Sequence, residues 1–346
     1  MKTTLRLVEK GLVPTPFVRK GIRRLLKDRL DEQRARFADP DPTFDEWLDH
    51  MQQSPVALVP EKANEQHYEL PPRFFELVLG PRLKYSSAYY DTPTSTLAEA
   101  EERMLALTVE RAGIRDGMAV LELGCGWGSL TTFMAERFPN SQIVAVSNSS
   151  PQRKHIMRRA RAAGLKNLEV RTCDMNMFDT EEKFDRVISV DMYDHMRNWN
   201  ELLGRIARWL RSDGKLFLHV FAHERFAYPF EVKDESDWMS EYFFTGGMMP
   251  SHDLLERLDG PMKEEKRWNV PGTHYGRTSE DWLRNQDHHK AEIMQIFRQT
   301  YGADDAGQWF HRWRVFFLAC AELFAYSNGT EWIVSHHLLQ PGDARS

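Results

Sequence analysis

Short apolar runs alternate with amphipathic segments along the chain from residue 118 onward. Apolar runs bounded by turn residues are typical of buried strands, and apolar residues at helical spacing are typical of amphipathic helices. The runs lie at residues 118–123, 142–147, 168–172, 184–190 and 216–221, and the helical segments lie at residues 128–137, 151–163 and 199–210. Because apolar strands that alternate with helices form a parallel sheet covered on both faces, the pattern predicts an α/β fold.

Three further helices are predicted outside this alternation. Apolar residues recur at helical spacing between Phe17 and Leu30, with Arg and Lys residues between them. Ser95 and Thr96, with Glu99 behind them, mark the start of another helix. The aromatic-rich segment 308–326 predicts a C-terminal helix that packs over the sheet.

The first of these helices leaves three alternatives open. A basic amphipathic helix can lie on an anionic membrane surface, which would give the protein a peripheral contact with a membrane. The same helix can instead pack on its own protein, or on a second subunit in a homodimer, with its basic face in solvent. The pattern of residues does not decide among these arrangements.

Composition narrows the class of protein and its partners. The chain has 346 residues, of which 41% are hydrophobic, so it can bury a large core. Its formal net charge of -5 gives no overall basic field, so nucleic acid is not an expected partner. The N-terminus lacks the apolar run of a signal peptide, and the three separated cysteines Cys125, Cys173 and Cys320 support neither disulfides nor a zinc site. We therefore expect a cytoplasmic protein without a metal.

Three alternating glycines, Gly124, Gly126 and Gly128, follow the first predicted strand and precede a helix. Glycines in such a turn let a ligand approach the main chain, and the first amides of the helix point toward that ligand. The dinucleotide-binding fingerprint is G-x-G-x-x-G, which after Gly124 and Gly126 would require a third glycine at position 129. Ser129 stands there, which counts against a dinucleotide cofactor and hydride transfer. Glu122 would place a carboxylate near the same crevice.

Ligands of parallel sheets lie outside the carboxyl ends of the strands. The candidate binding residues are therefore those that follow each predicted strand. They lie at residues 124–128, 148–152, 174–175, 191–195 and 219–223.

The glycine turn and its neighbours resemble motif I of the class I S-adenosylmethionine-dependent methyltransferases. Further motifs resemble the coclaurine N-methyltransferase-like proteins, which are relatives of the cyclopropane fatty-acid synthases. These motifs are Lys84-Tyr85-Ser86, residues 121–130, Asp194-His195-Met196, residues 241–247 and residues 328–332. The resemblance covers roughly residues 65–340 and implies a Rossmann-like class I methyltransferase sheet with helices on both faces.

Composition and the resemblance together divide the chain into three parts. We expect an N-terminal helical cap at residues 1–80, which are rich in Arg, Lys and Pro, and an S-adenosylmethionine-binding α/β core at residues 81–235. Residues 236–346 would hold a substrate-covering lid, from Ser236 to Pro250, and the C-terminal part of the core. The aromatic residues of this lid segment can equally be core residues.

The resemblance places S-adenosyl-L-methionine as the cofactor and assigns residues to each of its parts. The turn at Gly124, Cys125 and Gly126 would pass along the methionine part, with Glu122, Tyr85 and Ser86 near its amino and carboxylate groups. Asn148 and Gln152 would hold the ribose hydroxyls, and an amide does so without charge assistance. Asp174 would accept from the adenine amino group and Met175 would lie against the ring. All ten residues are predictions for one site.

The catalytic candidates are Asp191, Asp194 and His195, directly after the fourth predicted strand. Methyl transfer to an amine needs a neutral nitrogen, and a histidine beside a carboxylate, with a pKa near the working pH, suits removal of the proton. In the coclaurine enzymes a Glu-His pair has this place, and Asp194 here is one methylene shorter. The expected reaction is therefore N-methylation of a small-molecule amine.

The substrate candidates are Tyr89, His219, Glu241 and Tyr242, from the aromatic segment near Lys84, the fifth strand and the lid. In cyclopropane synthases a histidine that matches His219 belongs to a bicarbonate site together with a cysteine. Ser87 stands at that cysteine position, which counts against ring formation. Methylation or cyclopropanation of an unsaturated acyl chain of a phospholipid stays open as the alternative.

Two pairs of histidines lie outside these motifs. The pairs are His288-His289 and His336-His337, and neither has metal-ligand partners at a recognisable spacing. We expect both pairs on solvated surfaces of a helix or a strand.

Overall fold

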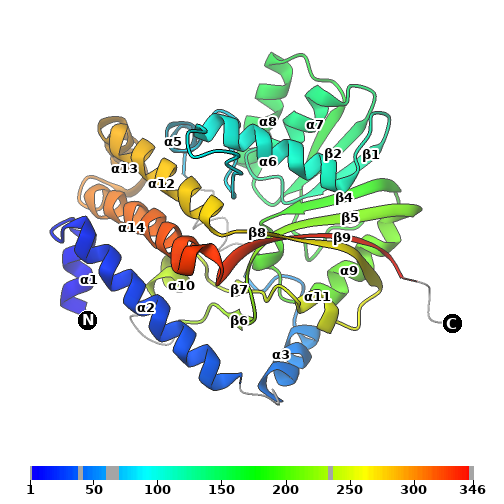
Figure 1. Ribbon diagram of the computed structural model, residues 1–346. Coiled ribbons are helices and arrows are strands. Elements are labelled where there is room, and N and C mark those ends of the chain that lie inside the picture. The colour runs from blue at the N-terminus through cyan, green and yellow to red at the C-terminus, as the bar shows by residue number, and fades with distance from the viewer. Residues whose placement is uncertain (1, 38–41, 60–69, 233–236, 343–346) are drawn as a thin grey trace.

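The centre of the molecule is a twisted seven-stranded sheet in the order β3-β2-β1-β4-β5-β9-β8 (Figure 1). The computed structural model describes residues 2–37, 42–59, 70–232 and 237–342. The strands of this sheet are β1 (Ala119–Leu123), β2 (Gln142–Ser147), β3 (Leu168–Thr172), β4 (Phe184–Val190), β5 (Leu210–His223), β8 (Met262–Val270) and β9 (Trp332–Pro341). A separate two-stranded sheet pairs β6 (Tyr228–Pro229) with β7 (Met248–Met249).

The sheet is mixed rather than wholly parallel. Strands β1 to β5 run parallel, and all five coincide with predicted strands, although β5 is longer than the predicted segment 216–221. The parallel arrangement predicted for these five strands is confirmed, whereas β9, which is antiparallel to both β5 and β8, and β8 itself were not predicted. The sequence hides β8 because charged side chains from Lys263 to Arg267 interrupt any apolar run.

Helices cover both faces of the sheet, as the α/β pattern predicted. Leu105 of α6, Met134 of α7 and Ile156 of α8 pack with Val120 of β1 on one face. Leu202 of α9 packs with Leu121 of the same strand on the opposite face, because neighbouring strand residues point to opposite faces. These helices are α6 (Leu97–Ala112), α7 (Ser129–Arg137), α8 (Ser150–Ala162) and α9 (Trp199–Trp209).

The start of α6 is fixed by a capping box. Thr96 accepts a hydrogen bond from the Glu99 amide, and the Glu99 carboxylate accepts one from the Thr96 amide. Two otherwise unpaired amides of the first turn are thereby satisfied. The predicted start of this helix is confirmed.

A second layer of helices, rich in aromatic residues, lies beside the carboxyl ends of the strands (Figure 1). Its centre is α14, where Trp313 and Phe317 are buried against α12 and α5. The remaining helices of the described chain are α1 (Lys2–Glu9), α2 (Thr15–Arg36), α3 (Pro42–Gln53), α5 (Pro72–Val78), α10 (Trp238–Tyr242), α11 (Leu254–Arg257), α12 (Thr273–His288), α13 (Lys290–Tyr301) and α14 (Ala306–Ala325). Two 3-10 turns, η1 (Tyr193–His195) and η2 (Tyr326–Gly329), complete the described elements.

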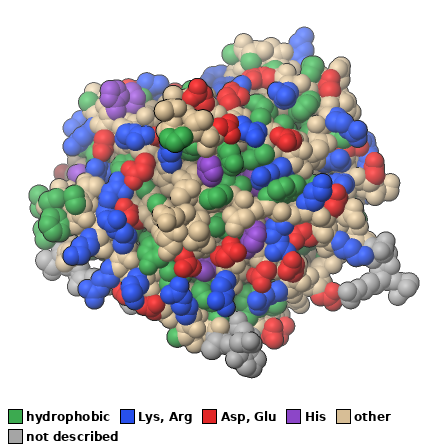
Figure 2. Space-filling view, in the orientation of Figure 1, with side chains coloured by type: hydrophobic (Ala, Val, Ile, Leu, Met, Phe, Trp, Pro, Cys, Tyr) green, Lys and Arg blue, Asp and Glu red, His purple; other side chains and the backbone are tan. Residues whose placement is uncertain are grey.

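The basic helix α2 packs on its own protein. Arg19 forms ion pairs with Glu280 of α12 and Glu322 of α14, and Arg29 pairs with Asp237. Figure 2 shows both signs of charge interspersed over the face that α2 crosses. Of the three alternatives for this helix, packing within the chain is therefore the one that its contacts support.

No helix in the described ranges is long and apolar enough to cross a membrane. Across those same ranges, no group of three or more histidine, cysteine, aspartate or glutamate residues is arranged to hold a metal ion. Ser236, at the start of the predicted lid, lies outside the described residues.

Candidate active site

A cavity opens at the carboxyl ends of β1, β2, β3 and β4, where the strand-end rule predicts it. Segments before and after the central core close its other sides. Its lining residues are Ala57, Val59, Gly124, Gly126, Val146, Ser147, Asn148, Gln152, Cys173, Asp174, Met175, Asp191, Met192, His195, Met196, Thr245 and Gly246. Eight of the predicted site residues are among them.

The glycine turn forms the floor of this cavity. Gly124 and Gly126 have φ angles of +79° and +50°, a region that side-chain-bearing residues rarely adopt. A Cβ atom on Gly124 would lie 2.6 Å from the Met192 side chain. The amides of Gly124 and Cys125 both donate to the Val146 carbonyl at 3.0 Å, which fixes the turn against β2. A side chain at Gly124 would therefore break the junction between the turn and the segment after β4.

The polar residues after β2 and β3 fit a nucleoside. The Gln152 side chain accepts from the Ser147 hydroxyl at 2.7 Å, while its buried Nε2 has no hydrogen-bond partner among the described residues. An unpaired buried donor is costly unless a ligand satisfies it, and a ribose hydroxyl can do so. Asp174 and Met175 line the cavity beyond it. The residues present therefore suit the nucleoside part of S-adenosylmethionine.

Four predicted cofactor residues lie behind the lining rather than in it. Glu122 is buried and accepts from the Thr131 hydroxyl at 2.6 Å, and burial raises its pKa to about 8. Cys125 is buried beside it. Tyr85 packs between Phe75 and Trp282, and Ser86 is hydrogen-bonded by the buried Lys84 ammonium. Their contact with a cofactor stays a prediction.

The three catalytic candidates gather where β4 ends. Asp191 and His195 line the cavity, and Asp194 lies behind them with its side chain 2% exposed. The Nε2 atom of His195 is 3.4 Å from Oδ2 of Asp194, so the predicted histidine and carboxylate are neighbours. Asp191 has a φ angle of +44°, and such strain in a residue other than glycine is concentrated at functional sites. Its Oδ1 atom accepts from the Phe221 amide at 3.2 Å.

Burial shifts the pKa values of this cluster toward the neutral forms. It raises the pKa of Asp191 to about 8, with help from the Asp194 carboxylate and against the nearby Lys84. It raises the pKa of Asp194 to about 7 and lowers that of His195 to about 4. Burial lowers the pKa of Lys84 to about 8. Near pH 7 the imidazole of His195 is therefore neutral, and the expectation that its pKa lies near the working pH was wrong, because burial disfavours the charged ring.

The predicted substrate residues are less closely grouped. His219 is buried beneath the cavity, 3.8 Å from Asp191 through its Nε2 atom. Tyr89 stacks on His274 at 4.1 Å between ring centroids, Glu241 is exposed, and Tyr242 lies under the Arg312 guanidinium. In the described part of the chain, none of these four side chains lines the cavity.

The prediction that His336 and His337 are solvated was wrong. Both lie in β9 in the interior of the sheet, and they are 0% and 2% exposed. His336 bonds His219 across the β5·β9 pair, and His337 bonds Glu264 of β8 and the Ser335 hydroxyl. The error came from missing β9, since polar residues at strand positions between two other strands are buried. His288 is exposed, as expected.

Some residues that reach the cavity from distant segments were not among the predicted site residues. Ala57 and Val59 come from the segment after α3, and Thr245 and Gly246 come from the loop after α10, inside the predicted lid. Small and apolar loop residues carry no chemical signature, so neither periodicity nor strand ends mark them as lining. Ser147 ends β2 and Cys173 follows β3, so the strand-end rule could have predicted both.

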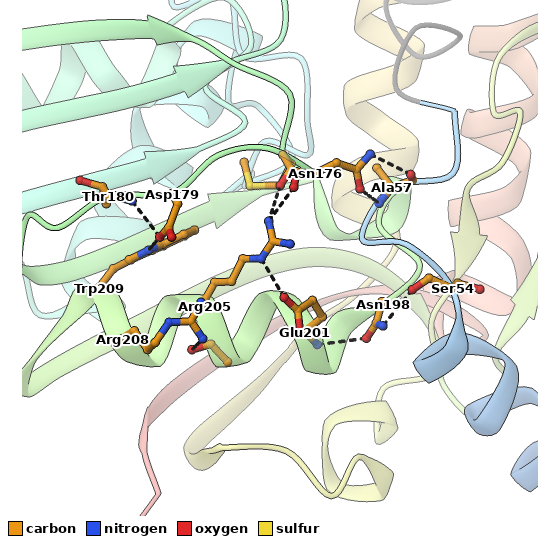
Figure 3. A network of polar contacts seen from close by, with 12 residues as sticks. Ser54, Ala57, Asn176, Asp179, Thr180, Asn198, Glu201, Arg205, Arg208 and Trp209 are labelled. Atoms are coloured by element: carbon orange, nitrogen blue, oxygen red, sulfur yellow. Dashed lines mark hydrogen bonds and ion pairs between the residues drawn. The ribbon is translucent and has the colours of Figure 1, made fainter.

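Asn176 fixes the first of these segments to the nucleoside side of the cavity (Figure 3). Its side chain accepts from the Ala57 amide at 2.9 Å and donates to the Ala57 carbonyl at 3.0 Å. Arg205 of α9 donates to the carbonyls of Met175 and Asn176 and pairs with Glu201 at 3.0 Å (Figure 3). The loop after β3 is thus held between α9 and the N-terminal segment.

Comparison with known proteins gives the same fold and names the family. The sequence model of the mycolic acid cyclopropane synthetase family matches residues 59–331. (S)-coclaurine N-methyltransferase of Thalictrum flavum subsp. glaucum is 36% identical over 97% of this chain and 94% of that protein. The cyclopropane-fatty-acyl-phospholipid synthase of Escherichia coli strain K12 is 28% identical over 78% of this chain and 66% of that protein.

Solved structures agree. A crystal structure of coclaurine N-methyltransferase bound to N-methylheliamine and SAH has a TM-score of 0.93 and 34% identity, and it covers 98% of this chain and 99% of that one. The mycolic acid cyclopropane synthase CmaA1, complexed with SAH and CTAB, shares the fold with a TM-score of 0.69 and 23% identity over 82% of this chain and 99% of that one. With the cavity and its glycine turn, these matches show that the chain belongs to the mycolic acid cyclopropane synthetase family and is an S-adenosylmethionine-dependent methyltransferase.

Proposed function

We propose that this enzyme methylates the nitrogen of a small, ring-bearing amine. The observation that carries the proposal is that His195, backed by Asp194, opens into the same cavity as the glycine turn. A proton acceptor and the methyl donor would then face one acceptor nitrogen. The relatives named for coclaurine N-methylation, at 36% and 34% identity, support an amine acceptor of this kind.

The residues around the cavity have different roles in the proposed reaction. When bound, the cofactor supplies an electrophilic methyl group. His195 and Asp194 together receive the proton that an incoming ammonium must lose: the imidazole of His195 faces the cavity, and the carboxylate of Asp194, 3.4 Å away and with a pKa raised by burial to about 7, stabilises the added proton. Asp191 offers a second carboxylate to the same nitrogen. Met192 and Met196 give the cavity flexible apolar walls that suit a ring.

Cofactor binding would use both the lining and the layer beneath it. Gly124, Gly126, Asn148, Gln152, Asp174 and Met175 would contact the cofactor directly. Tyr85, Ser86, Glu122 and Cys125 would shape the turn or meet the methionine end. Saturation of the Gln152 Nε2 donor by a ribose hydroxyl is the most specific of these contacts.

The test measures methyl transfer from S-adenosylmethionine to a panel of cyclic secondary amines. We expect turnover with at least one of them, and we expect His195→Ala to lower kcat by about 100-fold while cofactor affinity is retained. His288→Ala, at an exposed position on α12, is the control and should leave both unchanged. Wild-type rates for His195→Ala at every pH from 6 to 9 would overturn the assignment.

Methylation or cyclopropanation of a phospholipid acyl chain is the second candidate, because the family model is named for cyclopropane synthesis. Ser87 is buried, and its hydroxyl donates to the Ala88 carbonyl at 3.0 Å. A serine supplies no thiol at this place, which weighs against ring formation. Incubation with unsaturated phospholipid vesicles, followed by mass spectrometry, decides between acceptors. Co-sedimentation with the same vesicles tests a membrane contact of α2, and the oligomeric state in solution tests a homodimer.

A further inference from the structure

A line of three side chains runs from the outside of the sheet to the catalytic cluster. Nη1 of Arg111 on α6 lies 2.7 Å from Nδ1 of His336, and Nε2 of His336 lies 2.8 Å from Nδ1 of His219. Nε2 of His219 then faces Oδ2 of Asp191 at 3.8 Å. We propose that Arg111 is a positioning residue that sets the direction of this hydrogen-bond chain, so that His219 presents an N–H to Asp191.

The direction follows from the chemistry of the guanidinium. Arginine has five N–H donors and no acceptor, and it keeps its proton in proteins. His336 Nδ1 must therefore be the acceptor of the 2.7 Å bond and carries no hydrogen. The proton of the neutral His336 imidazole is then on Nε2.

The direction of the first bond determines the direction of the bond between His336 and His219. Nε2–H of His336 donates, so Nδ1 of His219 must accept and its proton must be on Nε2. That N–H points to the Asp191 carboxyl, and among the described residues His219 Nε2 has no hydrogen-bond partner. A small closure of the 3.8 Å gap would complete the chain and satisfy this buried donor.

The same geometry keeps both histidines neutral. Protonation of His336 would aim an N–H at the Arg111 guanidinium, and protonation of His219 would aim one at the Nε2–H of His336. Both rings are buried, which lowers the pKa of each well below its usual value, with contributions from Lys84 and Arg111. His219 is thus a fixed donor in this chain and not a base.

The guanidinium is itself held in place from outside the cavity. It stacks over the Trp268 ring of β8 at 5.0 Å, and the Arg111 side chain is half-buried. Arg111 does not line the cavity, so it would act only through the two histidines. Asp191, which also meets Lys84, Asp194 and the Tyr275 hydroxyl, would be kept as a hydrogen-bond acceptor by the His219 N–H.

The tautomers are testable without any methyl acceptor. In protein labelled with ¹⁵N-histidine, two-bond ¹⁵N–¹H spectra should show a bare Nδ1 and a protonated Nε2 for both His219 and His336. Arg111→Lys supplies another group that only donates and should preserve this pattern, whereas Arg111→Met should give mixed tautomers at both rings. Arg103→Met removes another stacked cation of α6 and serves as the matched control. Unchanged tautomers in Arg111→Met would overturn the proposal.

A second pair of variants protects the test against misfolding of Arg111→Met. The side-chain oxygen of glutamine can accept from Arg111 while its amide donates to His219, so His336→Gln should keep Nε2-protonated His219. His336→Leu should lose it. Equal His219 spectra in these two variants would also overturn the proposal.

The effect on the reaction rate rests on the proposed function, and it is measured separately from the histidine tautomers. With an amine acceptor, Arg111→Met should lower kcat/KM by about 10-fold to 100-fold, the effect of losing one hydrogen bond to a charged group. Arg111→Lys should recover most of it. If mixed tautomers in Arg111→Met left kcat/KM unchanged, Arg111 would be only structural. If no amine were methylated by the wild-type enzyme, the spectra would still decide the direction of the chain.

Discussion

At the residue scale, the site holds three buried carboxyl groups whose pKa values lie close to neutral pH. Burial raises the pKa of Glu122 to about 8, that of Asp191 to about 8 and that of Asp194 to about 7. A carboxyl group in this state can switch charge when a cation arrives, because the cation favours the ionised form. Both expected ligands, a sulfonium and an ammonium, carry positive charge. The buried acids are thus matched to the ligands that they would meet.

The first prediction concerns the pH dependence of the reaction. Asp194 assists only when it is ionised, so kcat/KM should fall by about tenfold per pH unit as the pH drops below about 7. His195 should not titrate in this range, since its pKa is lowered to about 4. Asp194→Asn should change the midpoint of the profile. The measurement is the pH profile of kcat/KM with two acceptors whose amine pKa values differ. If the midpoint of the profile shifted with the amine pKa of the acceptor, the assignment to Asp194 would be contradicted.

The second prediction separates stability from binding at Glu122. The native pKa lies above the ordinary value of 4.5, so the stabilisation is complete below pH 4.5 and is lost as pH rises toward 8. Glutamine resembles the protonated acid, so Glu122→Gln should match the wild-type Tm at pH 4 and exceed it by about 2 °C or more at pH 8. The same variant should bind S-adenosylmethionine about 10-fold more weakly, because the charged contact is gone.

Thermal scans at the two pH values and a cofactor titration check both parts. Glu181→Gln, at an exposed position, is the control and should follow the wild type throughout. A lower Tm for Glu122→Gln than for the wild type at pH 8 would contradict the prediction, because it would mean that the fold stabilises the ionised carboxylate rather than the acid.

Several of the site residues that the sequence predicts are polar residues that follow a predicted strand. Asn148, Gln152 and Asp174 follow strands, so the strand-end rule alone brings them to one cavity. No such rule marks Ala57 and Val59, because they are apolar and come from a segment about 65 residues before the glycine turn. Only the folded chain shows them.

At the element scale, the same distinction explains the two missed strands. β1, β2, β4 and the second half of β5 are mostly buried and consist of apolar runs, and the edge strand β3 alternates buried and exposed residues. β8 lies at the sheet edge and is charged, and β9 carries Ser335, His336 and His337 at buried positions. These polar residues satisfy one another and their neighbours across strands, which no local pattern reveals. The hydrogen-bond chain behind Asp191 was hidden for this reason.

The third prediction concerns how elements are joined around the cofactor. Asn176 makes two hydrogen bonds to Ala57, each worth about 1 kcal/mol. Asn176→Ala should therefore loosen residues 54–59 and raise the cofactor KM by at most about 30-fold. Hydrogen exchange of the amides in this segment, with the cofactor KM, provides the measurement.

Asn140→Ala is the matched control, because it removes an asparagine bonded to Asp116 at the far end of the sheet. Its exchange pattern at residues 54–59 should equal that of the wild type. Equal protection of this segment in Asn176→Ala would show that packing of Ala57 alone holds it.

At the scale of the whole molecule, the N-terminal helices are connected to the cavity through the lid. Glu9, at the end of α1, accepts from Trp238 of α10 at 3.0 Å and from Arg312 of α14 at 2.9 Å. The chain after α10 brings Phe244 next to His195, with 5.9 Å between ring centroids. The first helix, the segment predicted as a lid and His195 are thus joined by contacts from opposite ends of the chain.

The fourth prediction follows from this connection. Burial alone would raise the pKa of Glu9, but hydrogen bonds from Arg312, Trp238 and Gln308 lower it, so the carboxylate is ionised and its contribution is lost only as pH falls through and below 4.5. Glu9→Ala would leave Arg312, 13% exposed, without this partner and should cost about 3 kcal/mol of unfolding free energy at pH 7.

Because α10 loses its anchor, Glu9→Ala should also raise the KM for the acceptor more than it lowers kcat. Denaturant unfolding and steady-state kinetics on the same preparation give both values. Lys27→Ala breaks an exposed pair with Asp31 on α2 and should leave both within error of the wild type. A destabilised Glu9→Ala with an unchanged acceptor KM would confine Glu9 to holding the helices together, since a lid that depends on α1 must weaken acceptor binding when that helix is released.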